Sequence, residues 1–453
     1  MTVTPGGATL EIPSEDLVPQ QQSPNTAPTP RETRCAIVGG GPSGLILGLL
    51  LARQAVPVTV LEAHQDFDRD FRGDTIHSST LEMLEQIGLA GKLHELPHSK
   101  IRQMKVITPD SVHTLARFDR LPTRFPYVMV MPQSRFLEFI ADEARRYPQF
   151  ELLMGANVQR LIEEETALTP ALSQRAQRER ESVVRGVHYR TRDSEGEIRA
   201  DLTVAADGRF SKIRKLAALE PVSQSPEIDI VWFRLPRREE DPFEEGEIHA
   251  GCGGLMVLLV RQEQWQCGFV IRKGGYQQLR AAGLESLRER VAALVPWLAD
   301  RVGLLDDWKD LNVLSVESSR LTRWHKPGLL LIGDAAHVMS PVGGLGINYA
   351  IGDAVEAANV LANKLRGGTV DEAALAEVQR RREWPVRVAQ RVQRMMQHLL
   401  VDQTLDTSHT FRVPLPLRAL LHVPVLRDFP ARVAALGARR VRVEQPEPVA
   451  AGI

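Results

Sequence analysis

Six residues near the start of the chain decide its fold: Gly39-Gly40-Gly41-Pro42-Ser43-Gly44. The apolar run Cys35-Ala36-Ile37-Val38 comes directly before them and has the pattern of a short strand buried in a parallel sheet. Residues 43–54 have the pattern of a helix, and residues 56–62 that of a second strand, which ends in Glu62. These elements predict one βαβ unit, in which the N–H groups at the start of the helix can bind a phosphate.

The glycines of this turn have separate steric roles. Gly39 allows the tight turn, Gly41 lets a pyrophosphate approach the backbone, and Gly44 lets the helix pack closely on the strand. We expect Pro42 and Ser43 to lie against the same cofactor. The glutamate that ends the second strand, about 20 residues after the first glycines, can accept hydrogen bonds from ribose hydroxyls. The pattern therefore predicts dinucleotide binding, but by itself it does not distinguish FAD from NAD.

Two later segments favour FAD. The first, Ala205-Ala206-Asp207-Gly208-Arg209, follows a predicted strand. The second runs from Gly333 to Asn348 and places Asp334 at the end of a buried strand, where a carboxylate can bind ribitol hydroxyls. A glycine-rich helix start follows, and the partial positive charge at a helix N-terminus stabilises the negative charge that a reduced flavin gains.

Taken in this order and spacing, the three motifs resemble those of the group A flavoprotein monooxygenases of the para-hydroxybenzoate hydroxylase type, over about residues 34–400. The resemblance implies that NAD(P)H reduces the flavin and that O2 then forms a flavin C4a-hydroperoxide. It further implies that a dry pocket delivers oxygen to a small organic substrate, by hydroxylation or epoxidation. The implied reaction requires no protein nucleophile, so the resemblance assigns no catalytic residue. A dehydrogenase or reductase of the same fold is the alternative.

The resemblance also assigns cofactor contacts residue by residue. Asp334 would bind the FAD ribitol, and Pro341 would lie near the reactive edge of the flavin. Asp207-Gly208 would lie near the pyrophosphates of FAD and NAD(P)H. Arg72 and Arg135 match positions at which the family has arginines that contact the cofactor. The residues expected to line the isoalloxazine are Gly343, Gly344, Leu345, Gly346 and Ile347, and Asn348 completes the motif.

Changes of pattern along the chain predict an α/β fold, in which a Rossmann-like FAD-binding domain is interleaved with an antiparallel-sheet substrate domain and followed by C-terminal helices. We expect a disordered tail over residues 1–32, which are rich in Pro, Gln and Thr. The predicted FAD-binding segments are 33–110, 133–219 and 316–370, the substrate segments are 111–132 and 220–315, and the C-terminal region is 371–453. Helices are predicted over 134–146, 279–294, 346–366 and 371–400, and a polar surface insertion over 166–181.

Composition excludes several other classes of protein. The net charge is -1, from 56 Lys+Arg and 57 Asp+Glu, so nothing favours nucleic-acid binding. Three widely spaced cysteines, Cys35, Cys252 and Cys267, favour neither a disulfide framework nor a metal site. The sequence has no apolar segment long enough to predict stable membrane insertion. A cytoplasmic location is the simplest expectation. The sequence leaves the substrate, the choice between NADH and NADPH and the oligomeric state open.

Several conspicuous residues have a structural interpretation beside the functional one. His337 could transfer protons, but packing at a junction between a strand and a helix is the expectation. Trp232, Trp265 and Trp324 could face the substrate, although large aromatic residues on a sheet usually belong to the core. A flavin-dependent halogenase is disfavoured because its Trp-x-Trp-x-Ile-Pro segment is absent from the sequence. A binding protein that merely retains FAD remains a further alternative.

Overall fold

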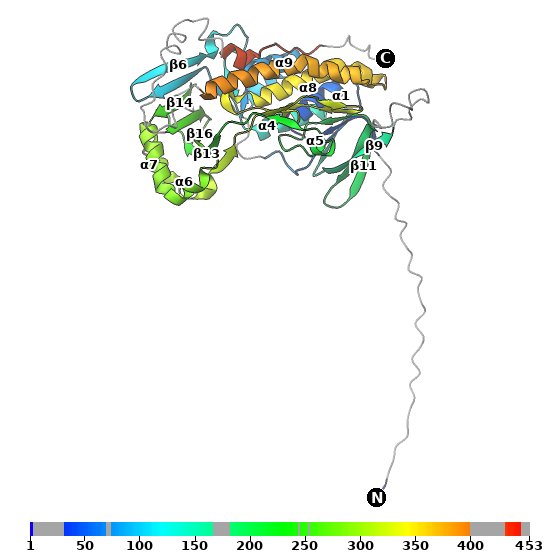
Figure 1. Ribbon diagram of the computed structural model, residues 1–453, viewed down its shortest axis with the longest axis horizontal. Coiled ribbons are helices and arrows are strands. Elements are labelled where there is room, and N and C mark those ends of the chain that lie inside the picture. The colour runs from blue at the N-terminus through cyan, green and yellow to red at the C-terminus, as the bar shows by residue number, and fades with distance from the viewer. Residues whose placement is uncertain are drawn as a thin grey trace.

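The computed structural model describes residues 1–2, 31–68, 74–165, 182–242, 245–251, 254–398 and 431–444. The predicted insertion at 166–181, Arg72, and most of the predicted tail therefore lie outside the described residues. Strand β1 begins at Arg31, which pairs with Ile198, so this strand includes the last two residues of the segment that we predicted as a tail. Figure 1 shows the two lobes: β9 and β11 lie at one end, and β6, β14, α6 and α7 at the other.

An eight-stranded sheet forms the half of the molecule that contains the glycine turn, which is called the cofactor half after the dinucleotide binding predicted for that turn. Its main path runs in the order β19-β20-β11-β1-β2-β8, and β1 pairs in parallel with both β2 and β11. The second half of β1 is buried, as expected for a parallel strand covered on both faces. The strands are β1 Arg31–Val38, β2 Val58–Glu62, β8 Phe150–Met154, β9 Asn157–Glu165, β10 Ser182–Arg190, β11 Glu195–Ala205, β19 His325–Lys326 and β20 Leu329–Leu331.

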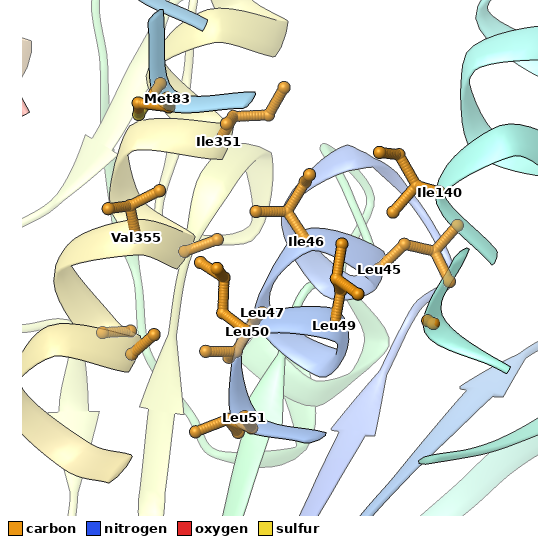
Figure 2. Packing of buried hydrophobic residues seen from close by; sticks show 14 of the residues in the cluster. Leu45, Ile46, Leu47, Leu49, Leu50, Leu51, Met83, Ile140, Ile351 and Val355 are labelled. Atoms are coloured by element: carbon orange, nitrogen blue, oxygen red, sulfur yellow. The ribbon is translucent and has the colours of Figure 1, made fainter. Parts of the chain in front are cut away.

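Helices cover one face of this sheet around a single apolar core. Helix α1 (Pro42–Arg53) packs against α8 (Gly346–Arg366) and α4 (Gln133–Ala144). Figure 2 shows the contact, where Ile46 and the leucines of α1 point toward Ile351 and Val355 of α8 and toward Ile140 of α4. The remaining helices of this half are α2 Ser78–Gln86, α3 Ala90–Glu95, α5 Lys212–Leu216 and α9 Glu372–Gln397. The bounds of α8 agree with the prediction, and α9 begins after its N-cap, Asp371.

A seven-stranded sheet forms the other half, in the order β17-β13-β16-β15-β14-β5-β6. The antiparallel strands predicted within 220–315 are present as β13, β15 and β16. The predicted boundary at residue 110 falls in the turn between β5 and β6, whose two strands both belong to this sheet. The strands are β5 Gln103–Thr108, β6 Ser111–Arg117, β13 Ile228–Pro236, β14 Glu245–Gly251, β15 Gly254–Val260, β16 Gln264–Arg272 and β17 Asn312–Ser315.

The two faces of this sheet have different neighbours. One face packs against α7 (Leu284–Leu294) and α6 (Tyr276–Ala282), and the other carries Trp232 toward the cofactor half. A single helix was predicted over 279–294, but Gly283 separates α6 from α7 because its φ of 89° cannot belong to a right-handed helix. Two three-stranded sheets complete the fold: β3 Thr75–Ile76 with β7 Val128–Val130 and β4 Ser99–Ile101, and β12 Pro221–Ser223 with β18 Ser319–Leu321 and β21 His337–Val338.

Residues 431–444 connect the two halves: Ala431, Ala435 and Leu436 pack in the apolar core of the seven-stranded sheet, and the residues after them contact α8 and α2. Residues 431–436 are helical, and the following residues up to 444 have no regular structure. Asn359 of α8 donates to the carbonyl of Arg442, and Gln86 of α2 accepts from the N–H of Val443. No helix in the described part of the chain is both long enough and apolar enough to span a bilayer.

Candidate cofactor and substrate site

A cavity of about 740 Å³ lies between the two halves. Its walls include the glycine turn that follows β1, the turn that precedes α8, and the side of the seven-stranded sheet that carries Trp232. A volume of several hundred Å³ is typical of sites for small molecules and cofactors. The three predicted motifs, which are far apart in sequence, therefore share one cavity with the predicted substrate sheet.

The glycine turn has the geometry that the sequence predicted. Gly39 has a φ of 109°, and a Cβ on it would lie 2.4 Å from the carbonyl oxygen of Ala206. A Cβ on Gly44 would lie 1.9 Å from the carbonyl oxygen of Gly39, so α1 begins in close contact with the turn. Gly41 has no atom within 4 Å of its Cβ position and lies at the N-cap of α1, which has no side-chain cap. The first N–H groups of α1 are therefore open to an anion from the cavity side.

Glu62 lies at the end of β2 with its carboxylate on the cavity wall. One carboxylate oxygen accepts the N–H of Gly40 at 2.8 Å, and the other accepts the N–H of His64 at 3.0 Å. The ring Nδ1 of His64 lies 2.7 Å from that second oxygen. These contacts fix the carboxylate beside the glycine turn, at the position where a ribose hydroxyl would meet it.

Asp207 lines the cavity at the end of β11 and also caps the next helix. Its carboxylate accepts the hydroxyl of Ser211 at 2.6 Å and the N–H groups of Lys212 and Ile213 at 2.8 and 3.1 Å. Burial raises the pKa of Asp207, and these hydrogen bonds oppose the rise. Asp207 therefore fixes the loop that begins with Gly208, which has a φ of 80° and no neighbour within 4 Å of its Cβ position.

The third motif forms the opposite part of the cofactor wall. Asp334 and Pro341 line the cavity, together with Gly344, Gly346 and Ile347 at the start of α8. The Oδ1 of Asp334 lies 4.0 Å from the position that a Cβ on Gly346 would take, so the carboxylate is close to the N-terminus of α8. Gly344 has a φ of 62°, and a Cβ there would lie 2.2 Å from Thr75 Oγ1, so this turn also needs glycine.

The structure does not bring every predicted site residue to the cavity. The side chain of Asn348 is buried and accepts the N–H of His77 at 2.8 Å while donating to the carbonyl of Gly344 at 3.1 Å, so it holds the turn in place from behind. Arg135 donates to the carbonyl of Pro97 at 3.1 Å and does not line the cavity. Gln133, two residues earlier on α4, lines the cavity instead. Arg72 lies outside the described residues.

One of the three candidate tryptophans faces the cavity. Trp265 and Trp324 are fully buried in the core, whereas Trp232 lines the cavity together with Gln266 of the adjacent strand β16 and Leu259 of the next strand, β15. The indole of Trp232 lies over Gly268, where a Cβ would come within 2.8 Å of the ring. The absence of a side chain at this position therefore allows the ring to lie flat against the sheet.

Gly268→Ala is expected to displace the indole of Trp232 from the sheet. The added methyl group would lie 2.8 Å from the ring, which is too close for van der Waals contact, so the ring must move into the cavity. We expect the KM for an organic substrate that contacts the indole to rise by about tenfold, since about 1.4 kcal/mol of contact would be lost, while binding of the predicted FAD is unchanged. Steady-state kinetics and a flavin titration of the variant and the wild type check this. An unchanged KM would contradict it.

A family model described as an FAD binding domain matches residues 32–392. The chain belongs to this family. It is an FAD-dependent monooxygenase that uses NAD(P)H, which confirms the family resemblance, the fold class and the two cofactors predicted from the sequence.

Relatives of this monooxygenase are known from sequence and from structure. The chain is 33% identical to 6-methylpretetramide 4-monooxygenase of Streptomyces rimosus over 414 residues, which are 89% of this chain and 92% of that protein. It is 24% identical to pentachlorophenol 4-monooxygenase of Sphingobium chlorophenolicum, with coverage of 70% of this chain and 56% of that protein. The structure of p-nitrophenol 4-monooxygenase from Pseudomonas putida is similar in fold, with a TM-score of 0.69, 18% identity, and coverage of 90% of this chain and 100% of that chain.

His337 of the monooxygenase is part of a buried network behind the cofactor wall. Its Nε2 lies 2.6 Å from Asp353 of α8, and since a carboxylate only accepts, this nitrogen carries the proton. Asp353 also accepts the Nε–H of Arg382 at 2.7 Å and the N–H of Gly333 at 2.9 Å. All three side chains are buried, and His337 does not line the cavity. The expected packing role therefore describes His337 better than proton transfer.

His77 makes the stability of the monooxygenase sensitive to acid. The side chain is buried beside Gly344, and burial lowers the pKa of His77 to about 4, although its Nδ1 lies 2.7 Å from the carbonyl oxygen of Ala434. The unfolded chain binds a proton here below its ordinary pKa of 6.5, and the folded chain does so only below about 4. Stability should therefore fall as the pH falls from 6.5 to 4, by roughly 3 kcal/mol in total.

The predicted loss of stability in acid is checked with urea unfolding of the wild type and of His77→Asn between pH 7 and pH 4. The variant cannot take up this proton, so its stability should change less over the same range. If the two proteins lose stability in parallel, another group is responsible.

Proposed function

We propose that this monooxygenase hydroxylates an aromatic small molecule, which binds between Trp232 and the turn before α8. One observation carries the proposal: a single cavity joins the glycine turn, the N-terminus of α8 and the indole of Trp232. The names of relatives support the aromatic class, since pentachlorophenol and p-nitrophenol are phenols. A flat indole next to leucine side chains is a surface that suits an aromatic ring.

The residues present fit an extended FAD. The open N–H groups at the start of α1 suit the pyrophosphate, and Glu62 suits the adenosine ribose. Asp334 suits the ribitol hydroxyls, and the N-terminus of α8 would stabilise negative charge on the reduced ring. In this placement the adenosine end would lie beside β2 and the ring end beside Gly344 and Trp232. FAD would supply the redox chemistry by which electrons from NAD(P)H activate O2.

The chain itself would bind, orient and shield the reactants. An apolar wall, formed by Trp232, Leu259 and Leu314, excludes water from the substrate carbon that receives oxygen. The wall belongs to a sheet backed by α7, so its side chains are held in place, which favours a single orientation of the substrate. We also propose a cytoplasmic location, which the two buried, unpaired cysteines Cys35 and Cys267 support.

The test is a measurement of oxygen incorporation. The purified protein is loaded with FAD and supplied with NADH or NADPH, isotopically labelled O2, and a panel of phenols and fused-ring aromatics. The proposal expects one labelled oxygen atom in the product and NAD(P)H consumption that rises when the substrate is present. Reduced nicotinamide that is consumed to form only hydrogen peroxide, with every compound of the panel, would contradict the aromatic class.

A further inference from the structure

Two glutamines of α9 reach the turn before α8, residues 340–345, from outside the cavity. The side-chain amide of Gln393 donates to the carbonyls of Ser340 and Val342, each at 2.7 Å. Gln397, one helical turn further along α9, donates to the hydroxyl of Ser340. Both glutamines are buried, and neither lines the cavity, whereas Ser340 does. The wall of the cavity is thus held from behind by the helix that follows α8.

The orientation of the Gln393 amide follows from its partners. Both partners are carbonyl oxygens, which only accept, so the nitrogen of the amide and not its oxygen must face them. The two N–H groups of one planar amide diverge, and each can serve one carbonyl. The side-chain oxygen of Gln393 accepts no hydrogen bond within the described residues. The two donated bonds therefore orient this side chain, and they tie two peptide groups of the turn to α9.

Other carbonyls of the turn are occupied as well. The carbonyl of Pro341 accepts the N–H of Gly344 at 3.0 Å, and the carbonyl of Gly344 accepts the side-chain amide of Asn348 at 3.1 Å. A peptide group of this turn cannot rotate without breaking such a bond, and a buried carbonyl left without a donor costs about 1–3 kcal/mol. Pro341 and Gly344 line the cavity between and beside the groups that Gln393 holds. Their position therefore depends on Gln393.

Helix α9 is a firm support for these contacts. Arg382 of α9 forms a buried ion pair with Asp353 of α8 at 2.7 Å. Gln390, on the same side of α9 as Gln393, donates to the carbonyls of Ser319 and Val338 at 3.0 and 3.1 Å. These bonds join α9 to α8 and to the strands before the turn. Gln393 thus connects the turn to a helix that is itself fixed.

We propose that Gln393, assisted by Gln397, is a positioning residue that sets the place of Pro341 and Gly344 against the flavin ring. The inference rests on the placement of the ring given under the proposed function, and it adds a determinant outside the cavity. A shift of the turn would change the space left for the ring and for the substrate beside it. Because small displacements of reacting groups slow a reaction strongly, the position of this turn matters for oxygen transfer.

The first test is the binding of FAD to Gln393→Met. Methionine has a similar length and volume but no donor, so the carbonyls of Ser340 and Val342 lose their partner. We expect the Kd for FAD to rise by about tenfold, because part of the binding energy must restore the turn. The visible absorbance and fluorescence of bound FAD should also differ from the wild type at saturation, since the surroundings of the ring change. Titration of the apoproteins with FAD gives both readouts without substrate or O2.

Gln390→Met is the matched control. Gln390 is buried like Gln393 and also donates to two carbonyls, but these belong to β18 and β21 and precede the turn. The two apoproteins should therefore unfold at similar urea concentrations, while Gln390→Met keeps the wild-type affinity for FAD and the wild-type flavin spectrum. Equal changes in FAD binding in both variants would reduce Gln393 to a structural role and exclude the proposal. Wild-type affinity and spectrum in Gln393→Met would exclude it as well.

If Gln393→Met does not fold, Gln397→Met decides. This variant leaves the carbonyls of Ser340 and Val342 paired and removes only the donor to the Ser340 hydroxyl. The Kd for FAD should rise by about threefold, since a single hydrogen bond is lost, and the flavin spectrum should again change. A wild-type affinity and spectrum in Gln397→Met would then overturn the proposal.

Turnover gives a separate readout. Each NAD(P)H that is oxidised yields either one oxygen atom in the product and one water, or one hydrogen peroxide. In Gln393→Met the share that ends as peroxide should rise, whereas in Gln390→Met it should stay at the wild-type level. The two proposals fail differently. Peroxide alone from the wild type with every aromatic compound contradicts the proposed function, whereas equal peroxide shares in the wild type and Gln393→Met contradict the role of Gln393.

Discussion

Replacing Asp353 by alanine is expected to lower the free energy of unfolding by about 3–5 kcal/mol. Asp353 is fully buried on α8, and its two oxygens accept hydrogen bonds from His337, Arg382 and the N–H of Gly333. Alanine would leave the guanidinium of Arg382 in the interior without its carboxylate, which is the most costly way to break an ion pair. Alanine would also leave the N–H of Gly333 without its acceptor. Gly333 directly precedes Asp334, the residue proposed to bind the ribitol.

The pH dependence of this contribution has a definite sign. Burial opposes ionisation of Asp353, but the charges of His337 and Arg382 and their hydrogen bonds outweigh it and hold the pKa below its ordinary value of 3.8. The stabilisation is therefore fully present above pH 3.8 and is lost as the pH falls through the lowered value. At neutral pH the wild type and Asp353→Ala should show the full difference in stability.

Asp201→Ala is the matched control. Asp201 pairs with Arg34 at 2.8 Å, close to the distance between Asp353 and Arg382, but both side chains of the Asp201 pair are partly exposed. Exposed ion pairs contribute about 1 kcal/mol or less because water solvates the separated charges. Urea unfolding at neutral pH, with the same excess of FAD for each protein, gives the comparison. A loss in Asp353→Ala no larger than that in Asp201→Ala would show that the buried network contributes little.

Features that depend on local geometry were predictable from the sequence. The turn at residues 39–44, the acid at the end of β2 and the start of α8 each follow from a short pattern whose meaning is set by its own backbone. The break between α6 and α7 had a local signal as well, because Gly283 stands inside the predicted helix, where glycine often ends one.

Features that depend on tertiary packing were not predictable. Asp74 and Arg261 are separated by 187 residues, and they meet only because β15 ends beside the start of β3. No spacing rule gives such a contact. The nearest local signal for this contact was Asp74 itself, an acidic residue directly before a short buried strand. Likewise, Arg135 and Gln133 lie two residues apart on α4, and a family position cannot show which of them faces the cavity.

The tryptophans illustrate the limit of pattern analysis in a sheet that is apolar on both sides. Trp232 faces the cavity, whereas Trp265 lies in the core under α7, because one sheet face meets a cavity and the other meets helices. Strand alternation identifies two faces, but it does not identify which of two apolar faces borders a ligand site. The distinction appears only when the second domain is placed against the sheet.

Gly39→Ala is expected to lower the affinity for FAD by about 100-fold, equivalent to about 3 kcal/mol. Gly39 has a φ of 109°, and a Cβ would lie 2.4 Å from the carbonyl oxygen of Ala206 and 2.8 Å from the backbone nitrogen of Asp207. Backbone atoms cannot rotate away as a flexible side chain can, so β1 and the end of β11 must separate. The variant would thus displace the glycine turn at 39–44 and the segment at 205–209 together. It should also be less stable than the wild type without FAD.

Gly41→Ala separates the loss of cofactor contact from the loss of fold. No atom lies within 4 Å of a Cβ at Gly41, so the apoprotein should unfold at the wild-type urea concentration. The methyl group would instead occupy the open side of the N-cap of α1, where the pyrophosphate is proposed to bind, and only FAD affinity should fall. Flavin fluorescence titration and urea unfolding of both apoproteins give the two readouts. Wild-type FAD affinity in Gly41→Ala would mean that the phosphate does not approach this residue, and the opening at the start of α1 would then need another explanation.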